Sequence, residues 1–139
     1  MKQAKELLQN GNYTCVLCKD DVVYTSTLTG IAPMVQFLSL EIDLRGFHAA
    51  DRIVGKAAAL LFVLAGVDCV YAPVMSRDAV NVFSLHHISC EYEQLTEQII
   101  NRAGTGPCPM EEAVSGIEDP QQAFESVKTA LTRLQQKQA

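Results

Sequence analysis

A lysine at the head of the most apolar segment is the first residue whose position could support chemistry. Lys56 follows Gly55 and precedes the run Ala57 to Val67, in which no side chain is polar. A lysine so placed can bind a phosphate or carboxylate, and one held neutral by burial can act as a nucleophile or general base. It can also extend its ammonium to water while its stem covers apolar surface. The segment does not match a phosphate-binding P-loop, which needs Ser or Thr after the lysine.

A cysteine between two prolines is the second candidate. Cys108 lies at the centre of residues 107–109, just before a short predicted helix whose first turn contains Glu111 and Glu112. Thiols near helix N-termini are commonly reactive, so Cys108 is a candidate nucleophile with Lys56 or Glu111 as its partner. The alternative is an inert thiol beside two glutamates that only complement the helix dipole.

The other cysteines and histidines give weaker signals. Cys15 and Cys18 have the spacing of metal and redox motifs, but they lie in a predicted strand, where side chains three positions apart point to opposite faces. No second Cys or His pair has the spacing of a zinc site, so we expect no metal and no cofactor. His86 and His87 end a predicted helix, where a cation interacts favourably with the helix dipole.

Hydrophobic periodicity and turn residues predict the elements that position these residues. Helices are expected over residues 2–9, 32–40, 52–65, 76–85, 95–101, 110–114 and 119–137, and strands over residues 13–19, 22–25, 69–75 and 88–92. Asp20 and Asp21 make a hairpin turn between the first two strands. Pro73 predicts interrupted strand pairing. The order predicts an α/β fold with three layers, α-β-α, around a mixed sheet.

The boundaries of the central helix depend on two signals. Residues 43–51 are predicted to form a loop whose last residue, Asp51, caps a helix that begins near Arg52. Gly66 is in the usual position to end it. After Lys56 this helix has no polar face, so we expect it to be buried against the sheet on every side. Its four large residues Leu60, Leu61, Val63 and Leu64 should then all be buried.

Composition limits the class of protein. The chain has 139 residues, of which 48% are hydrophobic and 19% charged, and its formal net charge is −5. We expect a single domain, residues 1–139, and no nucleic-acid partner, because binding to a phosphate backbone needs a basic face. The apolar run over residues 57–67 is shorter than the ~18 residues that span a bilayer. With no signal-peptide pattern at the start, we expect a cytoplasmic protein with no membrane partner and reduced thiols.

Residues 50–60, Ala-Asp-Arg-Ile-Val-Gly-Lys-Ala-Ala-Ala-Leu, resemble a small bacterial domain family of unknown function. The similarity extends over about Tyr13 to Val114 and includes residues 65–67, the strand to Ala72, Asn101-Arg102 and the run from Cys108 to Glu111. The resemblance implies a cytidine-deaminase-like fold. It also implies homo-oligomers, which deaminase-like domains commonly form.

The zinc chemistry of the deaminases is not expected here. Zinc deaminases carry His-x-Glu at the start of the buried helix and Pro-Cys-x-x-Cys at the start of the next one. The corresponding positions are Gly-Lys-Ala-Ala at residues 55–58, with no ligand and no acid, and Ser-Arg-Asp-Ala at residues 76–79, with no cysteine. The resemblance therefore predicts the fold without the zinc centre.

The sequence thus predicts a zinc-free deaminase-like domain that binds a small polar or anionic ligand, such as a nucleotide or nucleobase. The candidate catalytic residues are Lys56, Cys108 and Glu111, and the candidate ligand-binding residues are Asp51, Arg77 and Arg102. Two alternatives remain open. One is an enzyme that uses Cys108 as nucleophile, and the other is an oligomerising interaction module without catalysis.

Overall fold

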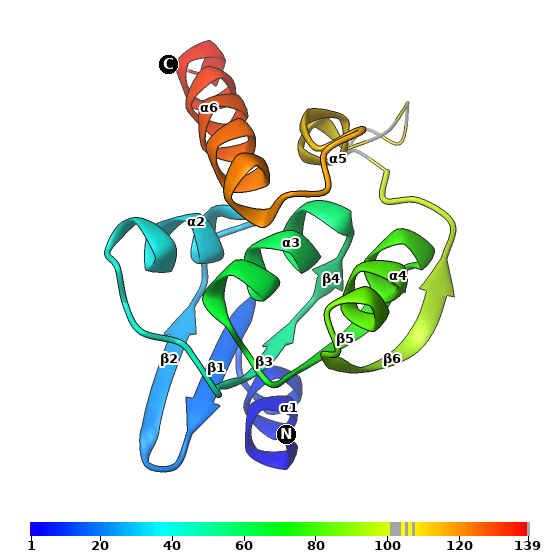
Figure 1. The fold of residues 1–139 in the computed structure, drawn as a ribbon. Helices are drawn as coiled ribbons and strands as arrows, with labels where there is room; N and C mark the ends of the chain where they lie inside the picture. Colours follow the sequence, from blue (N-terminus) through cyan, green and yellow to red (C-terminus); the bar gives the residue numbers. More distant parts are fainter. Residues whose placement is uncertain (101–103, 105, 107, 139) are drawn as a thin grey trace.

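In a computed structural model of the chain, the described residues form a six-stranded mixed sheet with helices on both faces (Figure 1). The structure describes residues 1–100, 104, 106 and 108–138. The strands are β1 (Cys15–Lys19), β2 (Val22–Ser26), β3 (His48–Asp51), β4 (Ile53–Val54), β5 (Cys69–Ser76) and β6 (Ser89–Thr96). The helices are α1 (Lys2–Asn10), α2 (Ala32–Ser39), α3 (Lys56–Ala65), α4 (Arg77–Leu85), α5 (Pro109–Ala113) and α6 (Pro120–Gln138).

The sheet combines an antiparallel half with a parallel half. β1 pairs antiparallel with β2 and β3, whereas β3, β4 and β6 pair parallel with β5. β3 and β4 keep one register along β5, since Ala50 lies opposite Tyr71 and Ile53 opposite Val74. Pro73, which has no N–H to donate, lies between these two paired stretches. The interruption predicted at Pro73 is therefore confirmed.

The predicted start of the central helix is wrong. Residues 43–51 contain the strand β3, and Asp51 ends that strand, where an oxygen of its carboxyl group accepts a hydrogen bond from the Arg52 N–H at 2.7 Å. The chain stays extended through β4 because these residues continue the pairing along β5. α3 begins only at Lys56, after an extended Gly55.

The last strand is longer than the predicted residues 88–92. β6 runs to Thr96, so the helix predicted over residues 95–101 is wrong. Backbone pairing with β5 over the whole of β6 overrides the helix-forming tendency of its glutamates and leucine.

The predicted hairpin turn, the predicted end of α3 at Gly66 and the predicted helix before residue 85 agree with the structure. β1 and β2 form the expected hairpin around Asp20 and Asp21. Gly66 ends α3 in the left-handed conformation, with φ of 78°. The Ser76 hydroxyl caps α4 by accepting a hydrogen bond from the Ala79 N–H at 3.1 Å.

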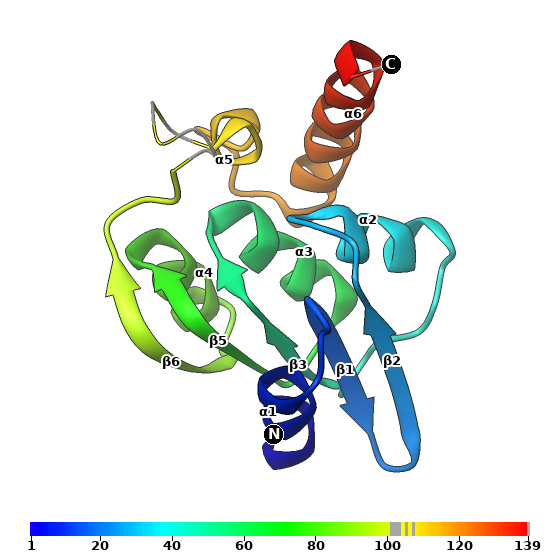
Figure 2. The ribbon, with the colours of Figure 1, turned by 180° about the vertical axis from the view of Figure 1, so that it is seen from behind.

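The two faces of the sheet are covered unequally (Figure 1, Figure 2). Among the described helices, α1 covers one face, where Ala4 and Leu8 pack against Val16, Ala50 and Tyr71. The other helices lie on the opposite side and enclose the larger core. The layers thus follow the predicted α-β-α order. No helix in the described residues is long and apolar enough to cross a membrane.

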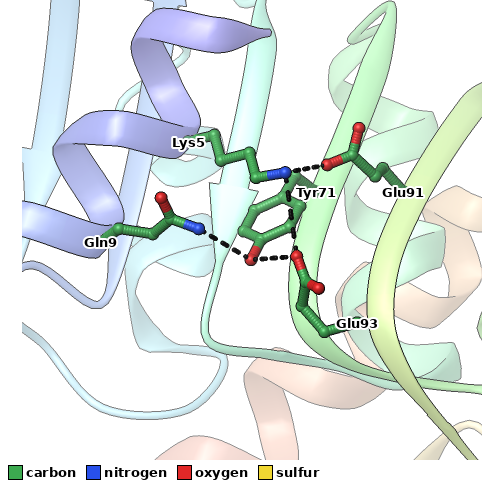
Figure 3. Close-up of polar contacts among 5 residues, drawn as sticks. All are labelled: Lys5, Gln9, Tyr71, Glu91 and Glu93. Carbon is green, nitrogen blue, oxygen red and sulfur yellow. Dashed lines mark hydrogen bonds and ion pairs between the residues drawn. The ribbon is translucent and has the colours of Figure 1, made fainter.

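A group of polar contacts joins α1 to the last two strands (Figure 3). The Tyr71 side chain, 1% exposed, donates from its hydroxyl to Glu93 at 3.2 Å and accepts from Gln9 at 3.4 Å. The Lys5 ammonium lies 4.7 Å from the centre of the Tyr71 ring and forms ion pairs with Glu91 and Glu93. These contacts satisfy the one polar atom of a large buried side chain.

α3 is the central helix of the larger core, although its burial is less complete than expected. Leu60, Leu61 and Phe62 have no exposed surface. Val63 and Leu64 are only partly buried, so the prediction that this helix is covered on every side holds for its first two turns and is wrong at its C-terminal end.

Candidate functional site

A cleft of about 450 Å³ lies where β5 and β6 end and the helices α4 and α5 begin. It is lined by Ser76, Asp78, Gln98, Ile99, Glu111, Glu112 and Ser115. A smaller hollow of about 210 Å³ shares Asp78 with the cleft and is lined also by Lys56, Asn81, Val82, Leu85 and Glu118. In open α/β sheets, ligands bind at the carboxyl ends of parallel strands, which is where this cleft lies.

A carboxylate from α5 is bound at the N-terminus of the buried helix α3. The two oxygens of Glu111 accept hydrogen bonds from the Lys56 N–H at 2.7 Å and the Ala57 N–H at 2.8 Å. These amides have no partner within the helix, so an anion is favoured at this position. Gly55 makes the approach possible, because a Cβ on residue 55 would lie 2.0 Å from Glu111 Oε1.

The protonation of Glu111 depends on two opposing effects. Burial raises the pKa of Glu111 above its ordinary value, and the nearby Asp78 carboxylate adds to the rise. The two amide hydrogen bonds oppose it. A buried carboxyl group with a raised pKa that lines a cleft is a candidate functional group.

The Lys56 side chain is paired with a different glutamate. Its ammonium lies 3.2 Å from Glu118 Oε1, and the lysine side chain is 16% exposed whereas that of Glu118 is 72% exposed. Lys56 therefore contacts Glu111 through its backbone N–H and Glu118 through its side chain. Two carboxylates from the segment around α5 thus hold the start of α3.

The cleft is acidic. Asp78, Glu111 and Glu112 line it, and its other polar residues are the uncharged Ser76, Gln98 and Ser115. In the smaller hollow the positive charge of Lys56 is balanced by Glu118. The anionic ligand that Lys56 suggested in the sequence is therefore not favoured by the charges that surround it.

The other sequence-predicted residues lie outside the described lining of the cleft. Cys108 is partly buried against the larger core, and its backbone N–H donates to the Ile99 carbonyl at 3.0 Å. Arg77 is exposed and pairs with Glu97 at 2.9 Å. Asp51 is buried in the sheet beside Cys15. Arg102 lies outside the described residues.

Much of the lining of the cleft comes from residues that the sequence analysis does not predict as site residues. Asp78 lies just after β5, Gln98 just after β6, and Glu112 follows the predicted Glu111. A search for polar side chains directly after each parallel strand would have found Asp78 and Gln98. The pairing of Glu118 with Lys56 has no local sequence signal, because the two residues are separated by 62 positions.

The described residues contain no group of three His, Cys, Asp or Glu side chains placed to hold a metal ion. At the two positions where the sequence resemblance to deaminases would place zinc ligands, the structure has the glycine-lysine start of α3 and the serine-capped start of α4. Neither supplies a histidine or cysteine. The residues present there do not fit a zinc ion.

Comparison with known proteins identifies one family. Residues 3–131 match the profile of a family described as TM1506, domain of unknown function (DUF1893). The structure is similar to a crystal structure of a DUF1893 family protein, TM1506, from Thermotoga maritima, with a TM-score of 0.82 and 23% sequence identity. The similarity covers 95% of this chain and 88% of the other. No curated protein matches the sequence.

Proposed function

Since the chain belongs to the DUF1893 family, a domain family of unknown function, we propose a function from the cleft itself. We propose that the cleft binds a small polar molecule rich in N–H donors. A nucleobase or nucleoside with an exocyclic amino group has this chemistry. We further propose that the fold is cytidine-deaminase-like and that the domain binds its ligand without zinc-dependent deamination.

The location and lining of the cleft support this proposal. A volume of about 450 Å³ lies within the range of small-molecule sites, roughly 300–1,000 Å³. The carboxylates of Asp78, Glu111 and Glu112 supply hydrogen-bond acceptors, and the Ile99 side chain supplies an apolar wall. Glu111 is fixed by α3, so Asp78 and Glu112 are the acceptors whose oxygens we assign to the ligand.

The charge of the cleft selects among ligands. A phosphate group would face Asp78 and Glu112, and Lys56, which lines the adjoining hollow, is already paired with Glu118. Like charges disfavour that arrangement. We therefore expect nucleosides and nucleobases to bind more tightly than the corresponding nucleotides.

The start of α3 supports binding without zinc chemistry. Where a deaminase has His-x-Glu, this chain has Gly55, Lys56 and Ala57, and the carboxylate of Glu111 lies on their amides. The deaminase-like assignment rests on the mixed sheet, the buried central helix and the strand-helix alternation that follows it.

A calorimetric titration tests the proposal. The protein is titrated with adenine, cytosine, their nucleosides and their monophosphates, and the thermal midpoint is followed in parallel. We expect binding of a base or nucleoside that is weakened by Asp78→Asn and Glu112→Gln and unaffected by Glu125→Gln, an exposed control on α6. Binding that depends only on the phosphate, or that these two variants leave unchanged, would contradict the proposal.

A further inference from the structure

The two edges of the sheet differ in composition. β2 forms one edge and pairs, in the described part of the chain, with β1 alone, while β6 lies at the other end and pairs with β5. β2 carries no charged side chain, and its valines Val22 and Val23 are 46% and 39% exposed. β6 carries the exposed Glu91 and Glu93. Native proteins commonly protect an edge strand with charge, and only β6 has that protection here.

The hairpin register shows which backbone groups of β2 face outward. Asp20 and Asp21 form a two-residue turn, so Lys19 and Val22 make the hydrogen-bonded pair that closes the hairpin. Bonded and non-bonded pairs alternate along an antiparallel ladder. Val23 and Thr25 therefore direct their N–H and C=O groups away from β1, toward the open edge.

We propose that the β2 edge pairs antiparallel with the β2 edge of a second copy of this chain, about a two-fold axis at Tyr24. This register places Val23 opposite Thr25 of the partner subunit, so each outward N–H meets an outward C=O. Both copies then exchange backbone hydrogen bonds at two symmetry-related pairs. The sheet continues from one copy into the other.

The side chains are compatible with this pairing. Val23 and the partner's Thr25 form a β-branched pair on one face, and Val22 lies opposite the partner's Ser26 on the other. The acidic turn at Asp21 lies opposite the partner's Thr27, so the aspartates of the two copies do not face each other. Tyr24 is held by Phe37 and Phe47, with ring centres 5.9 and 5.8 Å away, so the centre of the interface is preorganised.

The same operation is less favourable at the centre of the other edge. Antiparallel self-pairing of β6 centred on Tyr92 places Glu91 opposite the partner's Glu93, and pairing centred on Glu93 places the two glutamates opposite each other. Like charges directly opposite are destabilising in a sheet. The single Lys5 beside Glu91 and Glu93 balances only one of the two charges in each copy. The distribution of charge therefore favours the β2 edge as the surface for a second copy.

Sedimentation velocity over a range of protein concentrations tests the proposal. We expect the mass to rise from 15.2 kDa toward twice that value as the concentration increases. Thr25→Pro removes an outward N–H without removing a bond to β1, and Val23→Lys adds a charge to the edge. Each should weaken dimerisation by about tenfold or more, because every variant changes both symmetry-related contacts.

Two controls make the result specific. Thr25→Val keeps the N–H and the β-branched shape, and should dimerise like the original chain. Gln94→Lys places the same new charge on β6 and should also have no effect. Circular dichroism confirms that each variant is folded.

A chain that stays monomeric at every concentration, or a dimer that responds to Gln94→Lys but not to Val23→Lys, would overturn the proposal. A monomer that binds a synthetic peptide of residues 22–28 would also overturn it, by showing that the edge accepts a foreign strand instead.

Discussion

The carboxyl group of Asp51 provides a sharp test of the packing around the sheet. Asp51 ends β3 and is 6% exposed, and it lies opposite Cys15 of β1. Burial raises the pKa of Asp51 from its ordinary 3.8 to about 8, although the N–H groups of Arg52 and Ile53 and the charge of Arg52 oppose the rise. The folded protein therefore holds this proton up to neutral pH, whereas the unfolded chain releases it near pH 4.

The direction and size of the effect follow from linkage. A group whose pKa is higher in the folded state contributes stability that is complete below its unfolded pKa and is lost as pH rises through its folded pKa. For Asp51 this window extends from about pH 4 to about pH 8. At 1.36 kcal/mol for each pKa unit, the loss across it is on the order of 5 kcal/mol. That is a large part of the total stability of a small domain, about 5–15 kcal/mol.

Asp51→Asn isolates this contribution. Asparagine keeps the shape of the side chain and an oxygen that can accept the Arg52 N–H, but it carries no charge at any pH. We expect the variant to match the original chain near pH 4 and to be several kcal/mol more stable at pH 8. Urea unfolding of both proteins at intervals between pH 4 and pH 8 measures the difference in their free energies of unfolding. The titration of groups that the two proteins share cancels in this difference.

The control is Asp21→Asn in the exposed hairpin turn, which removes one carboxylate from the chain and leaves the buried end of β3 unchanged. If the free energies of unfolding for Asp51→Asn and the original chain run parallel between pH 4 and pH 8, the carboxyl group is not desolvated as the structure indicates. Asp51 would then be solvated, and this end of β3 would not be buried.

Two further predictions concern α3. Gly55→Ala should displace the Glu111 carboxylate and lower the free energy of unfolding by about 1.5–3 kcal/mol, since hydrogen bonds to a charged group are lost. Adding Glu111→Ala to this variant should then lower it little further. Additive losses in denaturant unfolding would show that the two residues act separately. Leu61→Ala should lower the free energy of unfolding by roughly 2–5 kcal/mol, because Leu61 is fully buried. Leu64→Ala should lower it less, because Leu64 is only partly buried. Equal unfolding midpoints for the two variants would contradict the observed burial.

Much of the fold could be predicted because its signals are local. The hairpin turn at residues 20–21 and the glycine that ends α3 each act within a few residues of the element they define. β3 could not be predicted in this way. Its sequence, His-Ala-Ala-Asp, has no β-branched or aromatic residue beyond the histidine ring, and it is extended because strands on both sides supply its hydrogen bonds.

The candidate site was only partly predictable for the same reason. Glu111 and Lys56 could be chosen by residue type and by their positions at helix starts. That Glu111 binds the amides of α3, and that Gly55 must be small for this purpose, depends on a contact between residues 55 positions apart. The charge of Arg77 suggests a ligand-binding role in the sequence, yet in the structure that charge is paired with Glu97 in an exposed position.

The sign of the charge in the cleft shows how such long-range pairs change a functional interpretation. Considered alone, Lys56 is a cation at a helix N-terminus and suggests an anionic ligand. In the folded chain Glu118 balances its ammonium and Glu111 takes the amides that an anion would use. The acids Asp78 and Glu112 then remain without a basic residue among the described residues that line the cleft. A ligand that donates hydrogen bonds is the one that these acceptors would stabilise.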